Sequence, residues 1–453
     1  MEEVSRRTTR GAVLRRRGAR RNARGGFAAL LAVAALTLAA AADANVVVER
    51  PVLSAPAVTS VGATTATGAA AVSGGGPAER GFLLTESVPA VGVAAGGELG
   101  SPALSPERVQ RELDDYLALG VGHVRADAPW AQIEPAPGVY DWSWPDRWIP
   151  YAHELGLDVI VTLAYSPRWV TGAEAGDKVG PKSAEERDAY AAAAAELVRR
   201  YPYVRALEIW NEPNHAGFWA APDPGGYADL LRRAYVAVKA AAPGVEVLGG
   251  ALAEPPFGEG IAPTAFLEGM YAAGAHGSFD ALSVHPYVGN GESIPWETPA
   301  ATGSWFGPAP SVLATLHANE PGKRVWSTET GDTALATTAP ATVGRILDTL
   351  RGYQTAGWGG PISWYAWRSL DAYSLTDESL GPRPAYLAFR QHVAAAFAAE
   401  ADLDFPAATC GIGEFWAPLT GLEPGRTYWA RAYARDRHGT VYGGVRRFTT
   451  ATP

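Results

Sequence analysis

The central part of the sequence, between about residues 90 and 400, alternates short apolar runs with longer stretches in which apolar residues recur at helical spacing. An apolar run of about four to eight residues, bounded by turn residues, is typical of a strand that is buried on both faces of a parallel sheet. The pattern predicts eight such strands, at residues 90–95, 122–127, 157–164, 204–210, 245–250, 279–285, 324–328 and 362–367.

Helix boundary signals lie between these strands. Ser105 followed by Pro106 is an N-cap with a proline in the first turn, and Gly120 is a stop signal for the same helix. Ser183 and Glu186 have the spacing of a capping box. The predicted helices lie at residues 105–120, 148–154, from 183 onward, 227–241, 265–273, 311–318, 341–354 and 384–399.

Eight strand–helix units in roughly 310 residues predict a (β/α)8 barrel, the α/β architecture that is also called a TIM barrel. A doubly wound open sheet is the alternative. It is disfavoured because nothing after the first strand, at residues 90–95, resembles a phosphate-binding glycine loop. We therefore assign residues 88–402 to a barrel domain.

Both flanks of the barrel region change to short strand patterns separated by Gly/Pro turns. Residues 45–87 contain about three such patterns, and residues 412–453 contain about three more. Three strands alone cannot close a sandwich core, whereas the first and last strands of a closed barrel are neighbours. We therefore predict that residues 45–87 and 403–453 form one β-sandwich domain with the barrel inserted into it. Two unrelated flanking segments are the alternative.

The first 44 residues have the composition of a signal peptide. Nine arginines lie within residues 1–26, an almost wholly apolar stretch covers residues 27–42, and Ala42-Asp43-Ala44 fits a small-x-small cleavage site. We therefore expect a secreted, extracellular protein, exported by the Sec route or, given two arginine pairs before the apolar stretch, by a twin-arginine route. An uncleaved membrane anchor is the alternative, but the stretch is short for a stable span.

Charge and cysteine content narrow the classes of partner. Removal of residues 1–44 leaves 29 basic and 44 acidic residues, a net charge of −15. This charge argues against nucleic acid or an anionic membrane surface as a partner. Cys410 is the only cysteine, so no internal disulfide can form. The eight histidines lack the paired spacing of zinc ligands, and neither a metal nor a cofactor is expected.

Two glutamates stand at the carboxyl ends of predicted strands. Glu212 follows the strand at residues 204–210, and Pro213 prevents that strand from continuing. Glu329 follows the strand at residues 324–328. Barrel enzymes carry their reactive groups at this end, and the fourth and seventh strands lie on opposite sides of the mouth, so the pair can face each other across a bound sugar. Retaining glycoside hydrolysis requires two carboxyl groups about 5–5.5 Å apart.

The segments around Glu212 and Glu329 resemble the acid/base and nucleophile signatures of the clan A glycoside hydrolases, which are retaining enzymes on a (β/α)8 barrel. The resemblance covers roughly residues 90–400, includes residues 134–142, and points to family 39 and to family 5-like enzymes. It implies that Glu212 is the acid/base and Glu329 the nucleophile. Separately, residues 422–428 resemble the turn before strand F of fibronectin type III-like domains, which implies a tyrosine-corner hydrogen bond from Tyr428.

The resemblance to clan A also implies roles in substrate binding. Asn211 would hydrogen-bond the 2-hydroxyl of the sugar, a contact that strengthens in the transition state. Arg125 would pair with Glu329 and keep it ionised. Tyr287 would hydrogen-bond and orient the same carboxylate.

Three further residues carry competing interpretations. His285 is either a sugar contact or a core histidine bonded to backbone. Either Trp364 or Trp367 would form the floor of the sugar subsite, and strand alternation alone does not choose between them.

Structural interpretations compete with the functional ones for several charged residues. Arg125 could form a structural ion pair with Asp127. Glu208 and Glu185 are expected to be solvated surface charges, as most glutamates are.

Aromatic residues in loops at the barrel mouth fit sugar binding, because the CH faces of a pyranose stack on rings. The loop at residues 289–308 is long enough to roof the site. Its alternative role is that of an ordinary surface loop with buried tryptophans. The candidates are Trp130, Tyr165, Trp169, His215, Trp219, Trp296 and Trp305.

The sequence therefore predicts a secreted retaining glycoside hydrolase with a carbohydrate substrate, no cofactor and no membrane partner after signal cleavage. Endo-action on a polysaccharide and exo-action as a β-xylosidase-like or β-glucosidase-like enzyme are both open, as is an α-L-arabinofuranosidase, which would use the same carboxylate pair. A non-catalytic, cell-surface carbohydrate-binding protein on the same fold is the alternative from another class.

Overall fold

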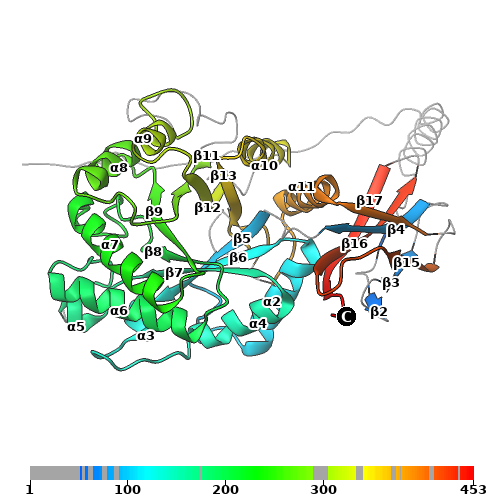
Figure 1. The fold of residues 1–453 in the computed structure, drawn as a ribbon, viewed down its shortest axis with the longest axis horizontal. Coiled ribbons are helices and arrows are strands. Elements are labelled where there is room, and N and C mark those ends of the chain that lie inside the picture. The colour runs from blue at the N-terminus through cyan, green and yellow to red at the C-terminus, as the bar shows by residue number, and fades with distance from the viewer. Residues whose placement is uncertain are drawn as a thin grey trace, which may run out of the picture. The chain divides into compact units, whose positions relative to one another are not determined.

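Eight parallel strands close into a barrel surrounded by helices, which confirms the predicted (β/α)8 fold (Figure 1). Strands that are consecutive in the ring pair in parallel, and β13 pairs with β5, so the first strand lies beside the eighth. The strands are β5 (Val91–Gly96), β6 (His123–Pro129), β7 (Asp158–Ala164), β8 (Ala206–Ile209), β9 (Glu246–Ala253), β10 (Ala281–His285), β12 (Arg324–Asp332) and β13 (Gly359–Tyr365). A two-residue strand, β11 (Tyr287–Val288), pairs with the end of β12.

The computed structural model describes most of the chain outside its first 51 residues. The described ranges are 52–53, 57–59, 65–73, 79–85, 91–172, 176–256, 258–288, 305–332, 340–368, 374–377, 379–407, 413–436 and 439–452. The predicted signal peptide, Cys410, Trp296 and most of the loop at residues 289–308 lie outside them. Within these ranges, no helix combines the length and the hydropathy needed to cross a membrane.

Each barrel strand is followed by a helix, as predicted. The capping box at Ser183 is present, because the Ser183 hydroxyl accepts from the Glu186 N–H and the Glu186 carboxylate accepts from the Ser183 N–H. The single-turn segments α3 (Trp130–Ile133), α5 (Arg168–Thr171) and η1 (Pro145–Arg147) are too short to produce a periodic pattern in the sequence. The longer helices are α2 (Pro106–Leu119), α4 (Ile149–Leu155), α6 (Ala184–Arg200), α7 (Pro224–Ala241), α8 (Pro263–Ala272), α9 (Val312–Asn319), α10 (Pro340–Thr355) and α11 (Pro384–Glu400).

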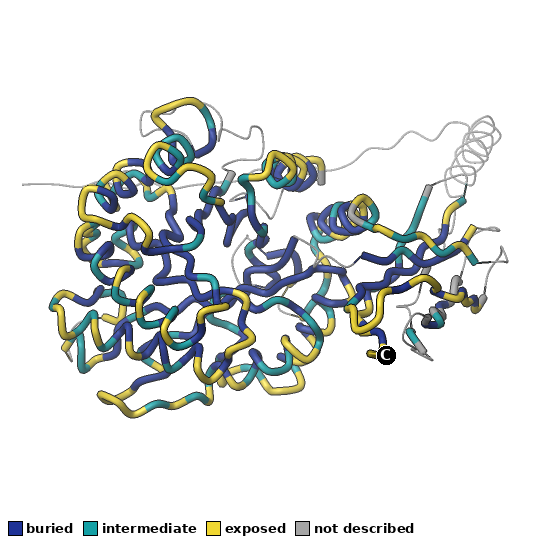
Figure 2. The backbone as a smooth tube through the Cα atoms, in the orientation of Figure 1, coloured by how far each residue is buried: buried dark blue, intermediate teal, exposed yellow. Residues whose placement is uncertain are grey.

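The barrel strands are buried on both faces (Figure 2). One face packs against the helices, and the other fills the barrel interior. Ile160 on β7, Ala206 on β8 and Trp326 on β12 are part of an apolar cluster to which β9 and β10 also contribute. Two residues further along β7, β8 and β12 the interior becomes polar, with Thr162, Glu208 and Thr328 all buried. The barrel therefore has an apolar layer beneath a polar one, and the polar layer lies towards the carboxyl ends of the strands.

Strands from both ends of the chain pair in two antiparallel sheets. β3 (Thr65–Ser73) pairs with β15 (Gly413–Thr420), and β4 (Glu79–Thr85) pairs with β16 (Thr427–Asp436) and β14 (Leu403–Pro406). Three strands complete the sheets: β1 (Val52–Leu53) and β2 (Ala57–Thr59), which pair with β3, and β17 (Gly439–Thr449), which pairs with β16. The barrel segment of the chain therefore lies between strands that pair with one another.

The two sheets share an apolar core. Phe82 on β4 and Phe415 on β15 are both buried, and their ring centroids lie 5.2 Å apart. The Tyr428 hydroxyl accepts a 2.8 Å hydrogen bond from the Glu423 N–H, which is the backbone bond that the resemblance implied. The assignment of this domain as fibronectin type III-like stays a prediction.

A buried arginine joins the sheets to the barrel helices. Arg431 on β16 donates from Nη2 to the Leu119 carbonyl at the end of α2, and from Nε to the Gly443 carbonyl. Gly120, with φ +92°, ends α2 beside it, and a Cβ there would lie 2.7 Å from Arg431 Nη1. Burial lowers the pKa of Arg431 to about 9. The guanidinium therefore satisfies a carbonyl that the helix end leaves without a partner.

We expect Phe82→Ala to lower the free energy of unfolding by about 3–5 kcal/mol, because it removes a buried ring from the sandwich core. Urea unfolding followed by tryptophan fluorescence measures the change. Glu414→Ala, an exposed position on β15, is the control and should stay within about 0.5 kcal/mol. In a double-mutant cycle with Phe415→Ala, strictly additive effects would contradict contact between the two ends of the chain.

Candidate active site

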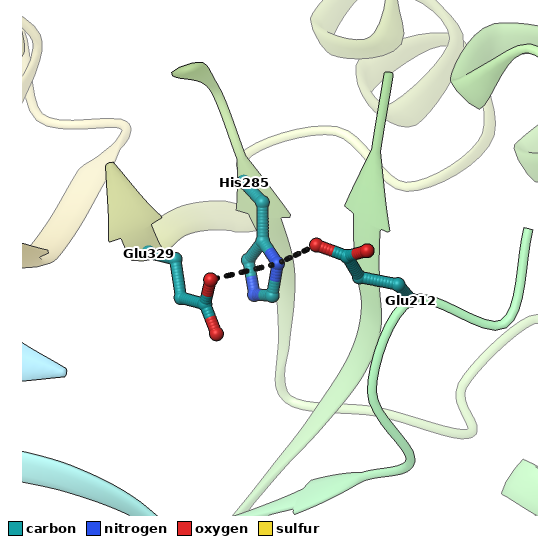
Figure 3. A group of neighbouring side chains, drawn as sticks. All are labelled: Glu212, His285 and Glu329. Carbon is teal, nitrogen blue, oxygen red and sulfur yellow. Dashed lines mark hydrogen bonds and ion pairs between the residues drawn. The ribbon is translucent and has the colours of Figure 1, made fainter. Parts of the chain in front are cut away.

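The two predicted carboxylates lie together, with His285 between them (Figure 3). Glu212 follows the end of β8, whereas Glu329 lies in the second half of β12, which continues past the predicted end at residue 328 to Asp332. Ligand atoms of Glu212, His285 and Glu329 all lie within 4.8 Å of one another. His285 Nδ1 is 2.8 Å from Glu212 Oε1 and 3.7 Å from Glu329 Oε2. Glu212 and Glu329 are 7% and 8% exposed, so both are almost removed from solvent. The strand-end prediction thus brought together two glutamates from distant parts of the chain.

The guanidinium of Arg125 links these groups from β6. Its Nη1 donates to Glu329 Oε1 at 2.5 Å, which is the predicted pairing. Its Nη2 donates to Asn211 Oδ1 at 2.8 Å and to Glu208 Oε2 at 2.7 Å. The competing partner, Asp127, lies 3.7 Å from Nη1 and makes the longer contact. Arg125 is fully buried, so these partners stand in place of water around its charge.

The prediction that Glu208 is a solvated surface charge is wrong, although Glu185 is exposed as expected. Glu208 is fully buried because it occupies an interior-facing position of β8, two residues after Ala206. Thr162 and Thr328 donate to its carboxylate at 2.8 and 2.7 Å. Its place inside a strand already predicted to be buried was the sequence signal for this role.

Burial and neighbouring charges shift the pKa values of Glu208 and His285 in opposite directions. Burial acts to raise the pKa of Glu208, but Arg125, His285 and the hydrogen bond from Thr328 outweigh it and lower the pKa below its ordinary value. Burial acts to lower the pKa of His285, but the charge of Glu329 and the hydrogen bond with Glu212 outweigh it and raise the pKa. The structure therefore favours a charged Glu208 and a readily protonated His285.

Tyr287 makes the contact with Glu329 that the resemblance implied. The Tyr287 hydroxyl donates to Glu329 Oε2 at 2.6 Å. With Arg125 on the other oxygen, both oxygens of Glu329 are held. His285 bonds to a side chain, Glu212, rather than to backbone, and its Nε2 makes no hydrogen bond within the described part of the chain.

The backbone around Glu212 is strained in a way that aims its side chain. Trp210 (φ +69°) and Glu212 (φ +46°) are both in the left-handed region, which disfavours residues with a Cβ. The ring of Trp210 is held by a 2.9 Å hydrogen bond to the Phe218 carbonyl. The Asn214 side chain donates to the Ala253 carbonyl and accepts from the Ala253 N–H. Packing and hydrogen bonds on both sides thus maintain this turn.

Neither predicted floor tryptophan lies with the carboxylates. Trp364 packs on Phe389 of α11, and Trp367 packs on Tyr116 of α2 and Tyr386 of α11. Both rings are therefore part of the packing between the barrel and its helices, which corrects the prediction.

Tyr365 is the aromatic residue that the sequence analysis missed. Ser363 faces the barrel interior, where His123 Nε2 lies 2.8 Å from its hydroxyl, so Tyr365 takes the same face and Trp364 the opposite one. The Tyr365 ring lies 6.3 Å from that of Tyr287, and it is half-buried. The alternation Ser-Trp-Tyr was the available signal, but it needed one known inward-facing residue.

The other candidate aromatics divide by burial. Trp130, Trp219 and Trp305 are buried in the main core, whereas Tyr165, Trp169 and His215 are half-buried. Lys178, which the sequence analysis did not single out, places its Nζ 4.3 Å from the centre of the Tyr165 ring and 4.2 Å from that of Phe218.

The same three ligand atoms raise the question of a metal site. In the described ranges, Glu212, His285 and Glu329 are the group of potential metal ligands that converge. Arg125 Nη1 lies 2.5 Å from Glu329 Oε1, and the positive charge of the guanidinium opposes a bound cation. Hydrogen bonds from Tyr287 and Arg125 also occupy the oxygens that a metal would need.

We expect Glu208→Ala to lower the free energy of unfolding by about 3–5 kcal/mol at neutral pH, because it removes a carboxylate from the buried Arg125 charge. The folded pKa of Glu208 lies below the unfolded value of about 4.3. Its contribution is therefore present above about pH 4.3 and is lost as pH falls through the folded pKa. Urea unfolding at several pH values measures this, with exposed Glu185→Ala as the control. Equal stability of the two variants would contradict the role of Glu208.

A family model described as beta-galactosidase, of glycoside hydrolase family 42, matches residues 103–206. The matched segment contains Arg125 but ends before both Glu212 and Glu329. No curated protein matches the chain.

Several solved structures resemble the chain. A family 39 glycoside hydrolase from the gut symbiont Bacteroides cellulosilyticus WH2 is 18% identical, with 86% of each chain covered and a TM-score of 0.54. A monomeric beta-xylosidase from Caulobacter crescentus CB15 is 20% identical over 78% of this chain and 75% of its own, with a TM-score of 0.51. A GH5_18 structure from Streptomyces cattleya is 18% identical over 68% and 80%, with a TM-score of 0.51. The similarity establishes the fold: the chain has a (β/α)8 barrel like those of these glycoside hydrolases.

Proposed function

We propose that the protein is a retaining glycoside hydrolase that cleaves O-glycosidic bonds by a double displacement. The observation that carries the proposal is the pair of facing glutamates, Glu212 and Glu329, because one oxygen of each lies within 4.8 Å of the other. Retaining enzymes hold their two carboxyl groups about 5–5.5 Å apart, whereas inverting enzymes leave about 6.5–9.5 Å for a water molecule. The spacing therefore supports attack by a carboxylate rather than by water.

Glu329 acts as the nucleophile. Arg125 and Tyr287 each hold one of its oxygens by a hydrogen bond, which orients the carboxylate for attack. Attack on the anomeric carbon forms a glycosyl-enzyme ester and neutralises the Glu329 charge. Water then releases the sugar from the ester.

Glu212 acts first as acid and then as base. It protonates the leaving oxygen in the first step and takes a proton from water in the second. His285 lies 2.8 Å from Glu212, so it holds the carboxyl group in place and responds to its charge. Because Arg125 engages Asn211 Oδ1, the amide NH2 of Asn211 is the group left to donate to the sugar 2-hydroxyl.

A non-catalytic carbohydrate-binding protein is the competing function. Such a protein has no need for the strained turn at Glu212 or for the two hydrogen bonds that fix Glu329. The intact set of Glu212, Glu329, Asn211 and Tyr287 therefore favours the enzyme. Substrate tests begin with aryl β-xylosides and β-galactosides, the sugars named for the matched family and a neighbouring structure, and extend to other β-glycosides, α-L-arabinofuranosides and soluble polysaccharides.

We expect Glu329→Ala to lower kcat/KM on the best aryl glycoside by several orders of magnitude, because no glycosyl-enzyme can form. Glu212→Ala should retain the first step on substrates with good leaving groups, which need no acid. Added azide should then give a glycosyl azide of retained configuration with Glu212→Ala and of inverted configuration with Glu329→Ala. Exchange of these two outcomes would reverse the assignment, and Glu185→Ala serves as a control that should match the parent.

The proposal includes export before action. The composition of residues 1–44 supports it. We expect N-terminal sequencing of protein from the culture medium to begin near residue 45. A full-length chain that stays in the membrane fraction would instead support an uncleaved anchor.

A further inference from the structure

Asp127 is a buried carboxylate that the proposed chemistry does not use. It lies two residues after Arg125 on β6, so both side chains share the interior face. Asp127 is 8% exposed, its Oδ1 makes no hydrogen bond within the described ranges, and its nearest cation, Arg125 Nη1, is 3.7 Å away. Buried carboxylate oxygens normally have hydrogen-bond donors. An unsatisfied one beside the reactive pair suggests that a ligand supplies the donor.

Lys178 is a cation on the other side of the same region. Its side chain is half-buried over the rings of Tyr165 and Phe218, and no carboxylate of the described residues lies within 4.0 Å of it. Tyr165 packs in turn on Trp210, two residues before Glu212. Burial lowers the pKa of Lys178, while the charges of Asp177, Asp127 and Glu212 act against burial.

Asp127 lies opposite Thr162 in the pairing of β6 with β7, and Tyr165, whose ring carries Lys178, follows directly after the end of β7. Asp127 and Lys178 therefore lie at the same end of two neighbouring strands without forming an ion pair. A carboxylate only accepts hydrogen bonds and an ammonium group only donates them, whereas a hydroxyl does both. A sugar that presents hydroxyls between the two satisfies both groups without bringing them together.

We propose that Asp127 and Lys178 recognise the hydroxyls of the reacting sugar. Asp127 accepts a hydrogen bond from one hydroxyl, and Lys178 donates to an oxygen beside it. The inference rests on the proposed function and deepens it by naming the substrate class. That class is a neutral glycoside with free hydroxyls away from C2, where Asn211 acts. An acidic sugar is disfavoured, because Asp127, Glu208 and Glu329 would repel its charge. Arg125 cannot offset this repulsion, because Glu208 and Glu329 already engage it, which leaves Lys178 to face the sugar.

The test pairs variants with substrate analogues. The parent, Asp127→Ala and Lys178→Met are assayed on the best aryl glycoside and on its monodeoxy analogues, each lacking one hydroxyl other than the 2-hydroxyl. In the parent, one analogue should lose about 10- to 100-fold in kcat/KM, the effect of a hydrogen bond to a charged group. In Asp127→Ala the intact substrate should fall by a similar factor, and removal of that hydroxyl should cost little more. Lys182→Met, an exposed lysine nearby in sequence, should match the parent.

The outcomes separate the inference from the function on which it rests. A parent that hydrolyses nothing in the panel contradicts the proposed function, and the inference falls with it. An active parent whose variants lose the same factor on every analogue contradicts the inference alone. A parent that prefers uronosides, with the preference lost in Lys178→Met, would also overturn it.

Stability gives a second readout that needs no substrate. Burial raises the pKa of Asp127 to about 6, against about 3.9 in an unfolded chain. The folded chain thus binds this proton more tightly, and the parent loses stability as pH rises from about 4 to about 6. Asp127→Asn cannot ionise, so its thermal midpoint should exceed that of the parent above pH 6 and match it below pH 4. A lower midpoint at pH 7 would make Asp127 a structural partner of Arg125 and overturn the inference.

Discussion

The buried charge of Arg125 is the constraint on which the polar centre of the barrel depends. A guanidinium keeps its proton at neutral pH, so a buried one requires carboxylate or carbonyl oxygens in place of water. Here Glu208 and Glu329 supply the charge, and Asn211 completes the set. Glu212 bonds to His285 instead. The two glutamates of the candidate site therefore differ in their surroundings, because the guanidinium engages Glu329 and not Glu212.

The layered interior of the barrel explains how such a costly arrangement is tolerated. An apolar layer below it, which includes Ile160 and Trp326, excludes water and supplies packing energy. Above that layer, Thr162 and Thr328 satisfy the oxygens of Glu208. The stability of the lower half thus supports strain and buried charge in the upper half, a common division in barrel enzymes.

The sequence was sufficient for the barrel because strands buried on both faces leave continuous apolar runs and helices carry local capping signals. It was sufficient for Glu212 and Glu329 because the ends of strands are visible in the same pattern. The prediction failed for Glu208, because most glutamates are solvated and this expectation was applied even inside a strand that was predicted to be buried. It failed for Tyr365 against Trp364, because the inward face depends on pairing with neighbouring strands, which no local window contains.

The insertion of the barrel between paired strands has a consequence for how the chain is made. The Thr85 hydroxyl bonds to Asp402, 317 residues further along the chain. The strand β16, which pairs with β4, lies further along the chain still. During synthesis from the N-terminus, the first sandwich strands appear with unpaired edges long before their partners exist. Barrel closure brings residues 91 and 362 side by side and so removes most of the loop entropy from the later pairing. Folding of the sandwich is therefore ordered after folding of the barrel, and early exposed edges are the stage at which the nascent chain is most prone to aggregate.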